Sequence, residues 1–449
     1  MILFVCLNET AYLCKKTTSM ISRLPKGLLT LVAIAAALCV SCAEKNRVVL
    51  GDERFDVYLP LLQGKRVAVL SNHSGIVGDK VENWCLKGGQ EVSPETVGIH
   101  FGEPSDTTKP VTYGPHLVDV LLEKGIDVTA IFSPEHGFRG TADAGELVGS
   151  GVDAKTGIPI LSLYEKGADS PGESSMDRFD ILVVDIQDVG LRYYTYYVTM
   201  QALMDECAAA GKPVVILDRP NPNGFYVDGP VLDMQYKSGI GSLPIAMVHG
   251  MTLGELAQMI NGEGWLKEGR KCELHVVPCL NYTHSTKCTL IVPPSPNLKN
   301  MRAVYLYSST CFFEGTCVTA GRGTSWPFEI YGHPDMADRG FSFTPRSIPG
   351  AKRPRYMDTT CNGVDLRDKP LDEIWAEGSN PGYVIDALRH MPEGCDFFSM
   401  GRHFELLTGA GWVRQMILDG ASGSEIRQRW APEADAFRLL RKPYLIYPE

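Results

Sequence analysis

The chain has 449 residues, of which 44% are hydrophobic and 21% are charged, a composition typical of a globular protein and not of a disordered or fibrous one. Its formal net charge of -10, with no Lys/Arg-rich run, argues against nucleic acid or an anionic membrane surface as the main partner. Because single cores rarely grow beyond about 250 to 300 residues, we expect two domains.

The amino terminus has the pattern of an export signal. Two basic residues precede an uncharged stretch at 27–40, which has the length of a signal-peptide core and is too short for a membrane span. A serine then stands directly before Cys42, as in a lipobox, so we expect residues 1–41 to be a leader and Cys42 to be lipidated. Cys39 stands where that pattern usually has Leu, which leaves plain secretion as the alternative. We expect an exported, periplasmic protein held at a membrane by its lipid.

A parallel sheet is predicted between residues 66 and 219, where short runs rich in Val and Ile alternate with helix-like segments. The predicted strands end at Ser71, Ser133, Tyr164, Ile186 and Asp218. Amphipathic helices are predicted at 116–125 and 196–211, each ending in a Gly that suits a C-cap. A third helix, at 252–261, begins with capping-box spacing.

The proline cluster at 293–296 interrupts both helix and sheet, and the pattern after it is less regular. We therefore expect an α/β fold, with a Rossmann-like parallel-sheet domain at 48–295 and a smaller mixed α/β domain at 296–449. The predicted elements of the second domain are strands at 355–366 and helices at 383–390, 404–407, 412–419 and 423–430.

Nine cysteines remain after the leader, without C-x-x-C or His/Cys metal spacing. We therefore expect no zinc site and no disulfide framework. Most of these cysteines fit small buried hydrophobic positions, with a pair or two open to oxidation after export.

The ligands of open parallel α/β sheets bind beyond the carboxyl ends of the strands, which makes the residues there the first candidates for a site. Polar residues are concentrated after four of the predicted strands, at 71–75, 133–140, 185–194 and 218–224. They bring carboxylates, amides, histidines, arginines and tyrosines to one rim, whereas a structural rim needs mainly turn formers. We therefore expect the functional site on this rim.

Some rim residues have a structural explanation of equal weight. Asn72, Asp218 and Asn221 suit helix caps or Asx-turns as well as ligand binding. His73 and His136 lack a third metal ligand at suitable spacing, so hydrogen bonding fits them better than metal coordination.

Three carboxylates are candidates for catalysis. Glu135 lies between a proline and a histidine, in a loop away from any capping position, which favours a functional role. Asp185 suits the buried end of its strand and Asp188 a more exposed position, and their spacing does not decide which of them is functional.

Several enzyme classes are disfavoured because their motifs are missing from the sequence. The chain has no G-x-G-x-x-G after the first strand and no P-loop, which argues against a nucleotide site. It also has no G-x-S-x-G elbow and no H-E-x-x-H, which argues against a serine esterase and a zincin protease. We expect no cofactor and no metal.

Four ordered blocks carry a family resemblance: SPEHGFRG at 133–140, DIQDVGLRYYTY at 185–196, DRPNPNG at 218–224 and EGTCVTAGRGTSWPFE at 314–329. Through them the chain resembles the exo-β-N-acetylmuramidase (NamZ, or YbbC-like) family over nearly all of its mature length. One departure is the stretch at 77–115, which looks longer than the family's usual connection between the first helix and the second strand.

The resemblance implies an exo-acting glycoside hydrolase that releases N-acetylmuramic acid from the non-reducing end of peptidoglycan fragments, in a cleft between two domains. Such hydrolysis commonly needs one carboxylic acid to protonate the leaving oxygen and a second group at the anomeric carbon. Glu135 is the candidate acid. Asp188 is a candidate base for water, and Asp185 a candidate to orient the substrate's acetamido group. Carboxyl groups about 6.5 to 9.5 Å apart would favour inversion and about 5 to 5.5 Å retention, so the mechanism stays open.

The lactyl ether of N-acetylmuramic acid ends in a carboxylate when no stem peptide is attached. Arg139, Arg192 and Arg322 are its candidate partners, since a bidentate contact contributes about 1.5 to 3 kcal/mol. Arg322 lies between two glycines, which would let a sugar approach the backbone closely. The other expected substrate-binding residues are Asn72, His73, His136, Gln187, Tyr196, Asp218, Asn221, Glu314 and Thr324.

Two other functions stay open at this point. A lipid-anchored protein that captures muropeptides without cleaving them would need the same arginines and aromatic residues, but it has no reason to place Glu135 beside a second carboxylate. An amidase or deacetylase would normally use a metal, for which the scattered His and Cys residues are poorly suited. The expected partners are peptidoglycan-derived saccharides, with a membrane contacted through the lipid anchor only, and no nucleic acid.

Overall fold

The structure is a computed structural model. It describes residues 47–82, 84–85, 103–104, 112–134, 138, 151–162, 173–290 and 292–449. The leader with Cys42 and three candidate site residues, Glu135, His136 and Arg139, lie outside the described residues. None of the helices within these ranges combines the length and apolar character that a transmembrane span requires.

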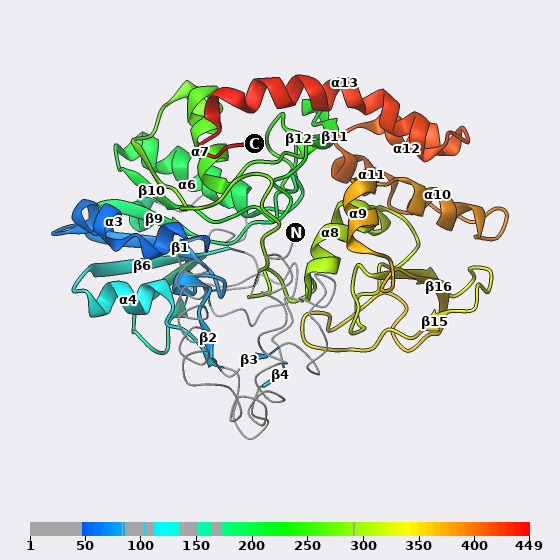
Figure 1. Ribbon diagram of the computed structural model, residues 1–449, viewed down its shortest axis with the longest axis horizontal. Coiled ribbons are helices and arrows are strands. Elements are labelled where there is room, and N and C mark those ends of the chain that lie inside the picture. Colours follow the sequence, from blue (N-terminus) through cyan, green and yellow to red (C-terminus); the bar gives the residue numbers. More distant parts are fainter. Residues whose placement is uncertain are drawn as a thin grey trace, which may run out of the picture.

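A seven-stranded sheet with the order β13-β10-β9-β1-β6-β8-β7 forms the centre of the first domain, on the left in Figure 1. Its strands are β1 (Arg66–Ser71), β6 (Asp127–Ser133), β7 (Gly151–Val152), β8 (Pro159–Ser162), β9 (Ile181–Asp185), β10 (Val214–Leu217) and β13 (Leu274–Val277). All neighbouring pairs are parallel except β7 with β8. The predicted parallel α/β sheet is confirmed, with β1 and β6 ending at the predicted residues.

Helices cover both faces of this sheet, which explains why its strands are continuous apolar runs. The helices are α3 (Phe55–Leu62), α4 (Leu117–Glu123), α5 (Glu173–Met176), α6 (Tyr196–Ala210) and α7 (Leu253–Gly262). Val67 and Val69 of β1 pack with residues of α3 and α4, whereas Ala68 and Leu70 belong to the core that includes α6 and α7. Side chains of successive β1 residues therefore bury themselves in opposite layers.

Local sequence signals set the ends of these helices. Gly211 terminates α6 in the left-handed conformation, with a φ of 64°. Thr252 and Glu255 form the predicted capping box at the start of α7. Both predictions are confirmed.

The order of the strands reverses at β1. From β1 the chain moves outward through β6 and β8, and then returns to the other side of β1 with β9, β10 and β13. The carboxyl ends of β1 and β9 are directly paired, Ser71 with Asp185. This is the topological switch point, where ligands of open α/β sheets bind.

The second domain is mixed α/β, as predicted, and lies on the right in Figure 1. Its antiparallel sheet has the order β14-β16-β15, with β14 (Ile330–His333), β15 (Ser342–Phe343) and β16 (Cys361–Asp365). Its helices are α8 (Met301–Thr310), α9 (Leu371–Glu377), α10 (Gly382–Arg389), α11 (Gly401–Thr408), α12 (Gly411–Leu418) and α13 (Gly423–Arg441). Helices were predicted at the positions of α10 to α13, whereas α8 and α9 were missed.

The last helix is longer than predicted because Pro432 does not end it. The prediction stopped at Trp430, but α13 continues to Arg441. Pro432 is exposed, where water can hydrate the carbonyl that the missing N–H leaves free, while Trp430 and Phe437 are buried on the other face. Packing of the apolar face therefore outweighs the local cost of the proline.

The remaining short elements form paired ribbons. Strands β11 (Asp228–Val231) and β12 (Ala246–Val248) make one antiparallel pair. The pairs β2 (Val81–Glu82) with β5 (Thr112–Tyr113) and β3 (Trp84–Cys85) with β4 (Glu103–Pro104) lie within the long 77–115 stretch.

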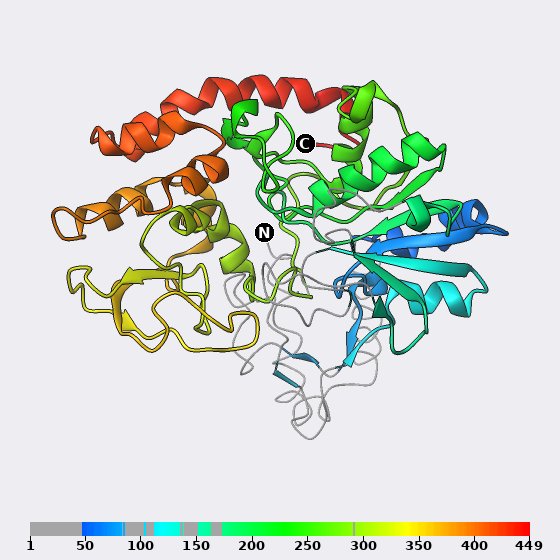
Figure 2. The same cartoon turned by 180° about the vertical axis from the view of Figure 1, so that it is seen from behind.

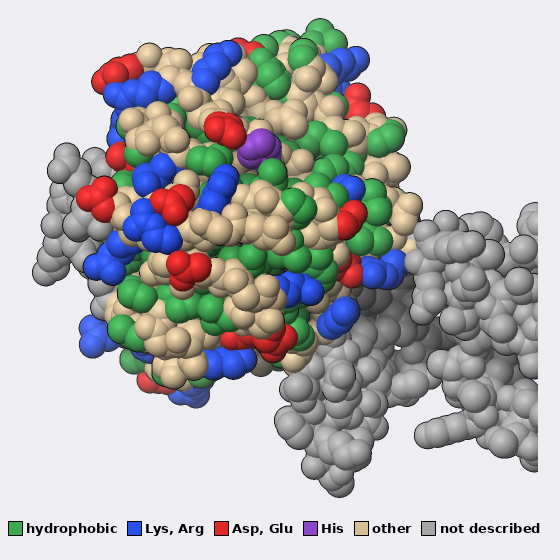
Figure 3. Space-filling model, turned by 90° about the vertical axis from the view of Figure 1, so that its left-hand side faces the viewer, with side chains coloured by type: hydrophobic (Ala, Val, Ile, Leu, Met, Phe, Trp, Pro, Cys, Tyr) green, Lys and Arg blue, Asp and Glu red, His purple; other side chains and the backbone are tan. Residues whose placement is uncertain are grey.

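The chain returns to the first domain at its C-terminus. Figures 1 and 2 show α13 crossing the top of the molecule toward α7. Beyond it, the Tyr447 hydroxyl donates to Oδ2 of Asp218 at 2.6 Å, and the Ile446 amide donates to Glu255 at 2.8 Å. The boundary at residue 295 stays a prediction, but the two predicted domains are tied together by the final residues. On the outer side of the sheet domain, acidic and basic side chains are interspersed (Figure 3).

Candidate active site

A buried charge network lies under the rim at the carboxyl ends of β1, β9 and β10. The Arg219 guanidinium contacts carboxylate oxygens of Asp52 at 2.7 Å, Asp79 at 2.9 Å and Asp185 at 2.7 Å. Burial raises the pKa of Asp52 well above its ordinary value and also raises the pKa of Asp79. Asp185 is fully buried and its Oδ1 is fixed by Arg219, which indicates a structural role for that oxygen, while its Oδ2 has no hydrogen-bond partner among the described residues.

Asp188 is differently placed from Asp185. Its Oδ1 accepts the Gly190 amide at 2.7 Å, while its buried Oδ2 has no hydrogen-bond partner among the residues that the structure describes. Burial raises the pKa of Asp188 to about 7. A carboxyl group with this pKa exchanges its proton near neutral pH, which suits a general acid or base.

Gln187 joins two rim loops next to Asp188. Its Nε2 donates to the carbonyls of Asp188 and Pro220, both at 2.8 Å, and its backbone amide donates to Ser74 Oγ. Its Oε1 is buried and has no hydrogen-bond partner within the described ranges. Oε1 is therefore the atom of Gln187 that remains for a ligand.

Three other predicted rim residues have their polar atoms engaged inside the fold. Asn72 bonds the Tyr196 hydroxyl and Ser74, and Asn221 forms an Asx-turn with the Asn223 amide at 2.8 Å. Asp218 accepts from Thr252 Oγ1 at 2.7 Å and from the Gly254 amide at 2.9 Å, at the start of α7. Burial raises the pKa of Asp218 to about 6. The structure favours the structural explanation for all three.

Arg192 requires a correction. We expected it to bind a carboxylate, but it is fully buried, and its guanidinium donates to the carbonyls of Pro230, Ile245, Leu407 and Thr408. Burial lowers the pKa of Arg192 to about 10. These bonds join the first domain to the end of α11, so Arg192 connects the domains and offers a ligand no exposed surface.

A cavity of about 140 Å³ lies between the two domains. Its lining includes Tyr193, Tyr194, Thr195, Tyr196 and Ile240 from the first domain, and Leu298, Tyr307, Cys311, Glu314, Arg322, Phe328, His403 and Leu407 from the second, with Ser295 at the predicted boundary. The second and fourth sequence blocks thus meet at this cavity. Of the candidates predicted to bind substrate, Tyr196, Glu314 and Arg322 line it.

Arg322 and Glu314 form an ion pair in the cavity wall. Nε and Nη2 of Arg322 both lie 2.7 Å from Oε1 of Glu314, and each side chain is 28% exposed. The guanidinium also lies 5.0 Å from the ring centre of Phe328. Phe328 has a φ of 67°, a left-handed conformation that is strained for a bulky residue, and such strain is frequent at functional sites.

The loop around Arg322 is shaped by packing. Thr324 Oγ1 donates to the Gly321 carbonyl at 2.7 Å and accepts the Trp326 amide at 3.0 Å, so Thr324 holds the turn and does not face a ligand with its hydroxyl. A Cβ on Gly321 would lie 2.5 Å from Ile330, and one on Gly323 would lie 2.5 Å from Pro354. Close packing therefore accounts for both glycines without a sugar.

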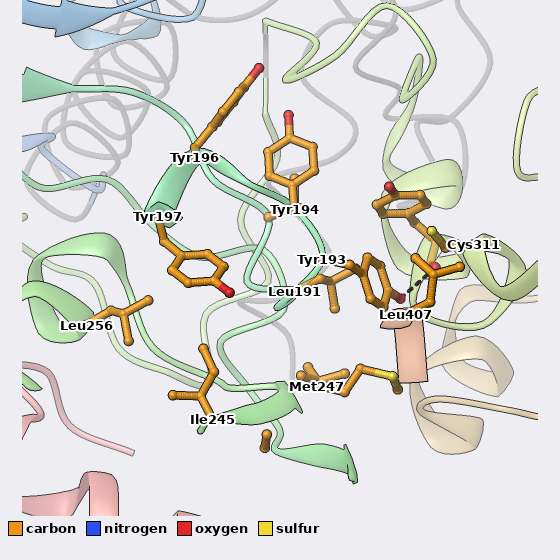
Figure 4. Close-up of a cluster of buried hydrophobic side chains, with 14 of the residues drawn as sticks. Leu191, Tyr193, Tyr194, Tyr196, Tyr197, Ile245, Met247, Leu256, Cys311 and Leu407 are labelled. Carbon is orange, nitrogen blue, oxygen red and sulfur yellow. Dashed lines mark hydrogen bonds between the residues drawn. The ribbon is translucent and has the colours of Figure 1, made fainter. Parts of the chain in front are cut away.

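Hydroxyl groups of the tyrosines connect the rim to the proline cluster. Tyr194 and Tyr196 both donate to the Pro294 carbonyl, at 2.6 and 3.0 Å, and His73 Nε2 lies 2.6 Å from the Pro293 carbonyl. Figure 4 shows the hydroxyls of Tyr194 and Tyr196 pointing the same way, whereas Tyr193 points in another direction, and its hydroxyl donates to the Tyr307 carbonyl at 3.0 Å. These bonds fix the segment that links the domains beside the cavity.

Sequence patterns missed several residues of the site. Tyr307 lies on α8, a helix that was not predicted, and His403 lies in the first turn of α11, before the predicted start of that helix at residue 404. The ion network of Arg219 was also missed, because its partners Asp52 and Asp79 are 167 and 140 residues away in the chain. Within the described ranges, no group of three or more His, Cys, Asp or Glu residues is arranged to hold a metal ion.

Comparisons with known proteins agree with the four blocks. The family model of the N-terminal part of exo-β-N-acetylmuramidase NamZ matches residues 105–302, and the model of its C-terminal part matches residues 305–447. A peptidoglycan β-N-acetylmuramidase NamZ from Bacillus subtilis (strain 168) is 34% identical over 90% of this chain and 92% of its own length.

Two crystal structures of DUF1343 family proteins from Bacteroides fragilis NCTC 9343 share the fold. One is 50% identical with a TM-score of 0.76, and the other is 25% identical with a TM-score of 0.65. Each match covers 90% of this chain and 99% of the solved chain. Because both halves match and the identity extends over most of the length, this chain belongs to the exo-β-N-acetylmuramidase NamZ family.

Proposed function

We propose that this protein is an exo-acting glycoside hydrolase that releases N-acetylmuramic acid from the non-reducing end of peptidoglycan fragments, and that the terminal sugar binds in the cavity between the domains. The family match supports the activity. The observation that carries the location is that the 185–196 and 314–329 blocks, far apart in sequence, line one cavity at the edge of the sheet's switch region.

Asp188 is the proposed base of this reaction. A pKa near 7 leaves a large fraction of the group ionised at neutral pH, and Oδ2 remains available to accept a proton from water. Asp188 lines a small cavity of about 10 Å³ with Arg219 and Asn221, beside the cavity between the domains and not within its wall. Glu135, outside the described residues, remains the candidate acid.

Arg322 is the proposed partner of the lactyl carboxylate. It is an arginine of the cavity wall with 28% of its side chain exposed, and Glu314 orients its guanidinium. A substrate carboxylate that approaches Arg322 has to compete with Glu314, so we expect selectivity for muramic acid to depend on both residues. Arg139, outside the described residues, remains a second candidate.

The location of the protein in the cell is a further part of the proposal. The uncharged stretch at 27–40 followed by Cys42 supports export and a lipid anchor, so that the catalytic domains meet wall fragments in the periplasm. Membrane fractionation of cells that produce the parent protein or Cys42→Ser tests this. We expect the parent in the membrane fraction and the variant in the soluble fraction. The same distribution of both proteins between the two fractions would contradict the lipid anchor.

The activity is tested on a disaccharide of N-acetylmuramic acid and N-acetylglucosamine, by following release of free N-acetylmuramic acid. We expect cleavage by the parent and a loss of about a hundredfold or more in Glu135→Gln. Tight binding without cleavage by the parent would favour a muropeptide-binding protein. Cleavage that stops in excess chelator would favour a metal-dependent hydrolase.

A further inference from the structure

Two cysteines of the second domain lie in contact, although they are 78 residues apart in the chain. Sγ of Cys317 and Sγ of Cys395 are 3.8 Å apart. Both side chains are partly exposed, so an external thiol reagent can reach them. Cys207, Cys272 and Cys311, by contrast, are buried.

The backbone holds the two cysteines in register. The Cys317 amide donates to the Phe397 carbonyl at 2.8 Å, and the Cys395 amide closes a turn on the Pro392 carbonyl at 3.2 Å. Phe397 is 3% exposed and belongs to the main core, which anchors the segment of Cys395. The two segments are thus fixed next to each other, and side-chain rotation together with a small shift would bring the sulfurs from contact to bonding distance, about 2.05 Å.

The segment of Cys317 is anchored as firmly. A Cβ on Gly315 would lie 2.4 Å from Cα of Phe404, which shows how closely the chain before Cys317 is packed against α11. The Tyr356 hydroxyl also donates to the Cys317 carbonyl at 2.6 Å. Neither cysteine is therefore free to move away from the other.

We propose that Cys317 and Cys395 form a disulfide bond when the protein is exposed to an oxidising compartment. The two S–H bonds break and one S–S bond forms, while the disulfide of a thiol oxidoreductase, or of a small-molecule disulfide, is reduced to two thiols. The exchange balances atoms and electrons without another reagent. The bond uses neither Glu135 nor Asp188, so it stands independently of the proposed catalysis.

The bond would connect two parts of the cavity wall. Cys317 lies five residues before Arg322, and Cys395 lies eight residues before His403, and both of these residues line the cavity. A covalent link closing a long loop also restricts the unfolded chain. The disulfide is therefore expected to stabilise the second domain and to hold the wall that carries Arg322.

Peptide mapping tests the bond directly. The purified full chain is incubated with oxidised glutathione, alkylated and digested with trypsin without reduction. We expect peptide 303–322 to be linked to peptide 390–402. Because the first peptide also contains Cys311, fragmentation has to place the link on Cys317. A link through Cys311, or alkylation of both proposed partners after the incubation, would overturn the proposal.

Thermal unfolding provides the second measurement. We expect the oxidised parent to unfold about 5 °C above its reduced form, and Cys317→Ser and Cys395→Ser to lose this difference. Cys288→Ser, which removes another partly exposed cysteine, should keep both the difference and the linked peptides. An equal difference in all four proteins would contradict the assignment of the bond to this pair.

Discussion

The rim of the first domain and the cavity wall of the second domain use their polar residues differently. On the rim, Asp218 and Asn221 are at most 3% exposed, and their oxygens accept hydrogen bonds from the fold itself. In the cavity wall, Glu314 and Arg322 each keep 28% of the side chain exposed. Polar residues after strand ends thus mainly hold loops together here, and a ligand is expected where a polar group keeps exposure or lacks a partner.

Asp188 shares features with both the rim residues and the cavity-wall residues. It belongs to the rim by position, but one of its carboxylate oxygens lacks a hydrogen-bond partner among the described residues, and its pKa is raised to about 7 by burial. We therefore expect a change of a rim residue to affect mainly stability, and a change of Asp188 or of a cavity-wall residue to affect mainly activity.

The largest effect on stability is expected from Arg219→Met. The change leaves the buried carboxylates of Asp52 and Asp185, and the partly exposed Asp79, without their cation. Removing one partner of a buried ion pair costs about 3 to 5 kcal/mol. The loss should be larger at pH 8 than at pH 5, because the carboxyl groups can take up protons at the lower pH. Urea unfolding at both pH values measures it.

Arg66→Met is the matched control for Arg219→Met. Arg66 pairs with Asp180 on the surface, where the two side chains are 47% and 43% exposed, so its loss should cost at most about 1 kcal/mol. Equal losses for the two variants would contradict the structural role of the Arg219 network.

Asp188→Asn should abolish most of the activity while leaving the fold intact. We expect kcat to fall by about a hundredfold or more, since the amide cannot take a proton, while its oxygen can still accept the Gly190 amide. In the parent, kcat/KM should rise with pH and level off above about pH 7, where Asp188 is ionised. Asp180→Asn, a surface carboxylate, is the control and should keep this profile.

Asp188→Asn should lower activity but raise the stability of the folded protein at alkaline pH. The pKa of Asp188 is raised in the folded protein, so the folded state binds more protons than the unfolded state between about pH 4 and pH 7, and parent stability falls as pH rises through that range. Asp188→Asn removes this loss. We expect its melting temperature to exceed that of the parent at pH 8 and to match it near pH 4, and a variant less stable than the parent at pH 8 would argue against a buried, ionised Asp188.

Arg322→Met should weaken selection of the lactyl carboxylate. We expect KM for a substrate with a free lactyl carboxylate to rise about ten- to hundredfold, and KM for the same sugar with that carboxylate amidated to change little. Arg346→Met, which removes a cation paired with Asp358 on the surface, is the control. An equal change in KM for both substrates would show that Arg322 does not recognise the lactyl carboxylate.

Thr324→Val should have the smallest effect. Its hydroxyl holds the turn through Gly321 and Trp326, so its loss should cost about 1 kcal/mol of stability and raise KM severalfold by loosening the Arg322 loop. Substrate titration and thermal unfolding measure the two effects. A large fall in kcat with unchanged KM would instead indicate that Thr324 contacts the reacting sugar.

The sequence by itself determined the parallel sheet, the caps of α6 and α7, and membership of the family. These follow from local information, since runs of Val and Ile suit strands covered on both faces, and a glycine at position 211 ends a helix wherever it packs. Four short blocks in order were sufficient for the family, because each is a contiguous stretch of chain.

Only the tertiary structure decided which polar residues serve the fold and which remain for a ligand. Arg192 and Arg322 have the same side-chain chemistry, but two of the four carbonyls that accept hydrogen bonds from Arg192 belong to residues 407 and 408, more than 200 positions away. The extension of α13 past Pro432 was decided in the same way, by burial of Trp430 and Phe437. Hydrogen-bond partners and burial depend on contacts between distant segments, and neither spacing nor composition records those contacts.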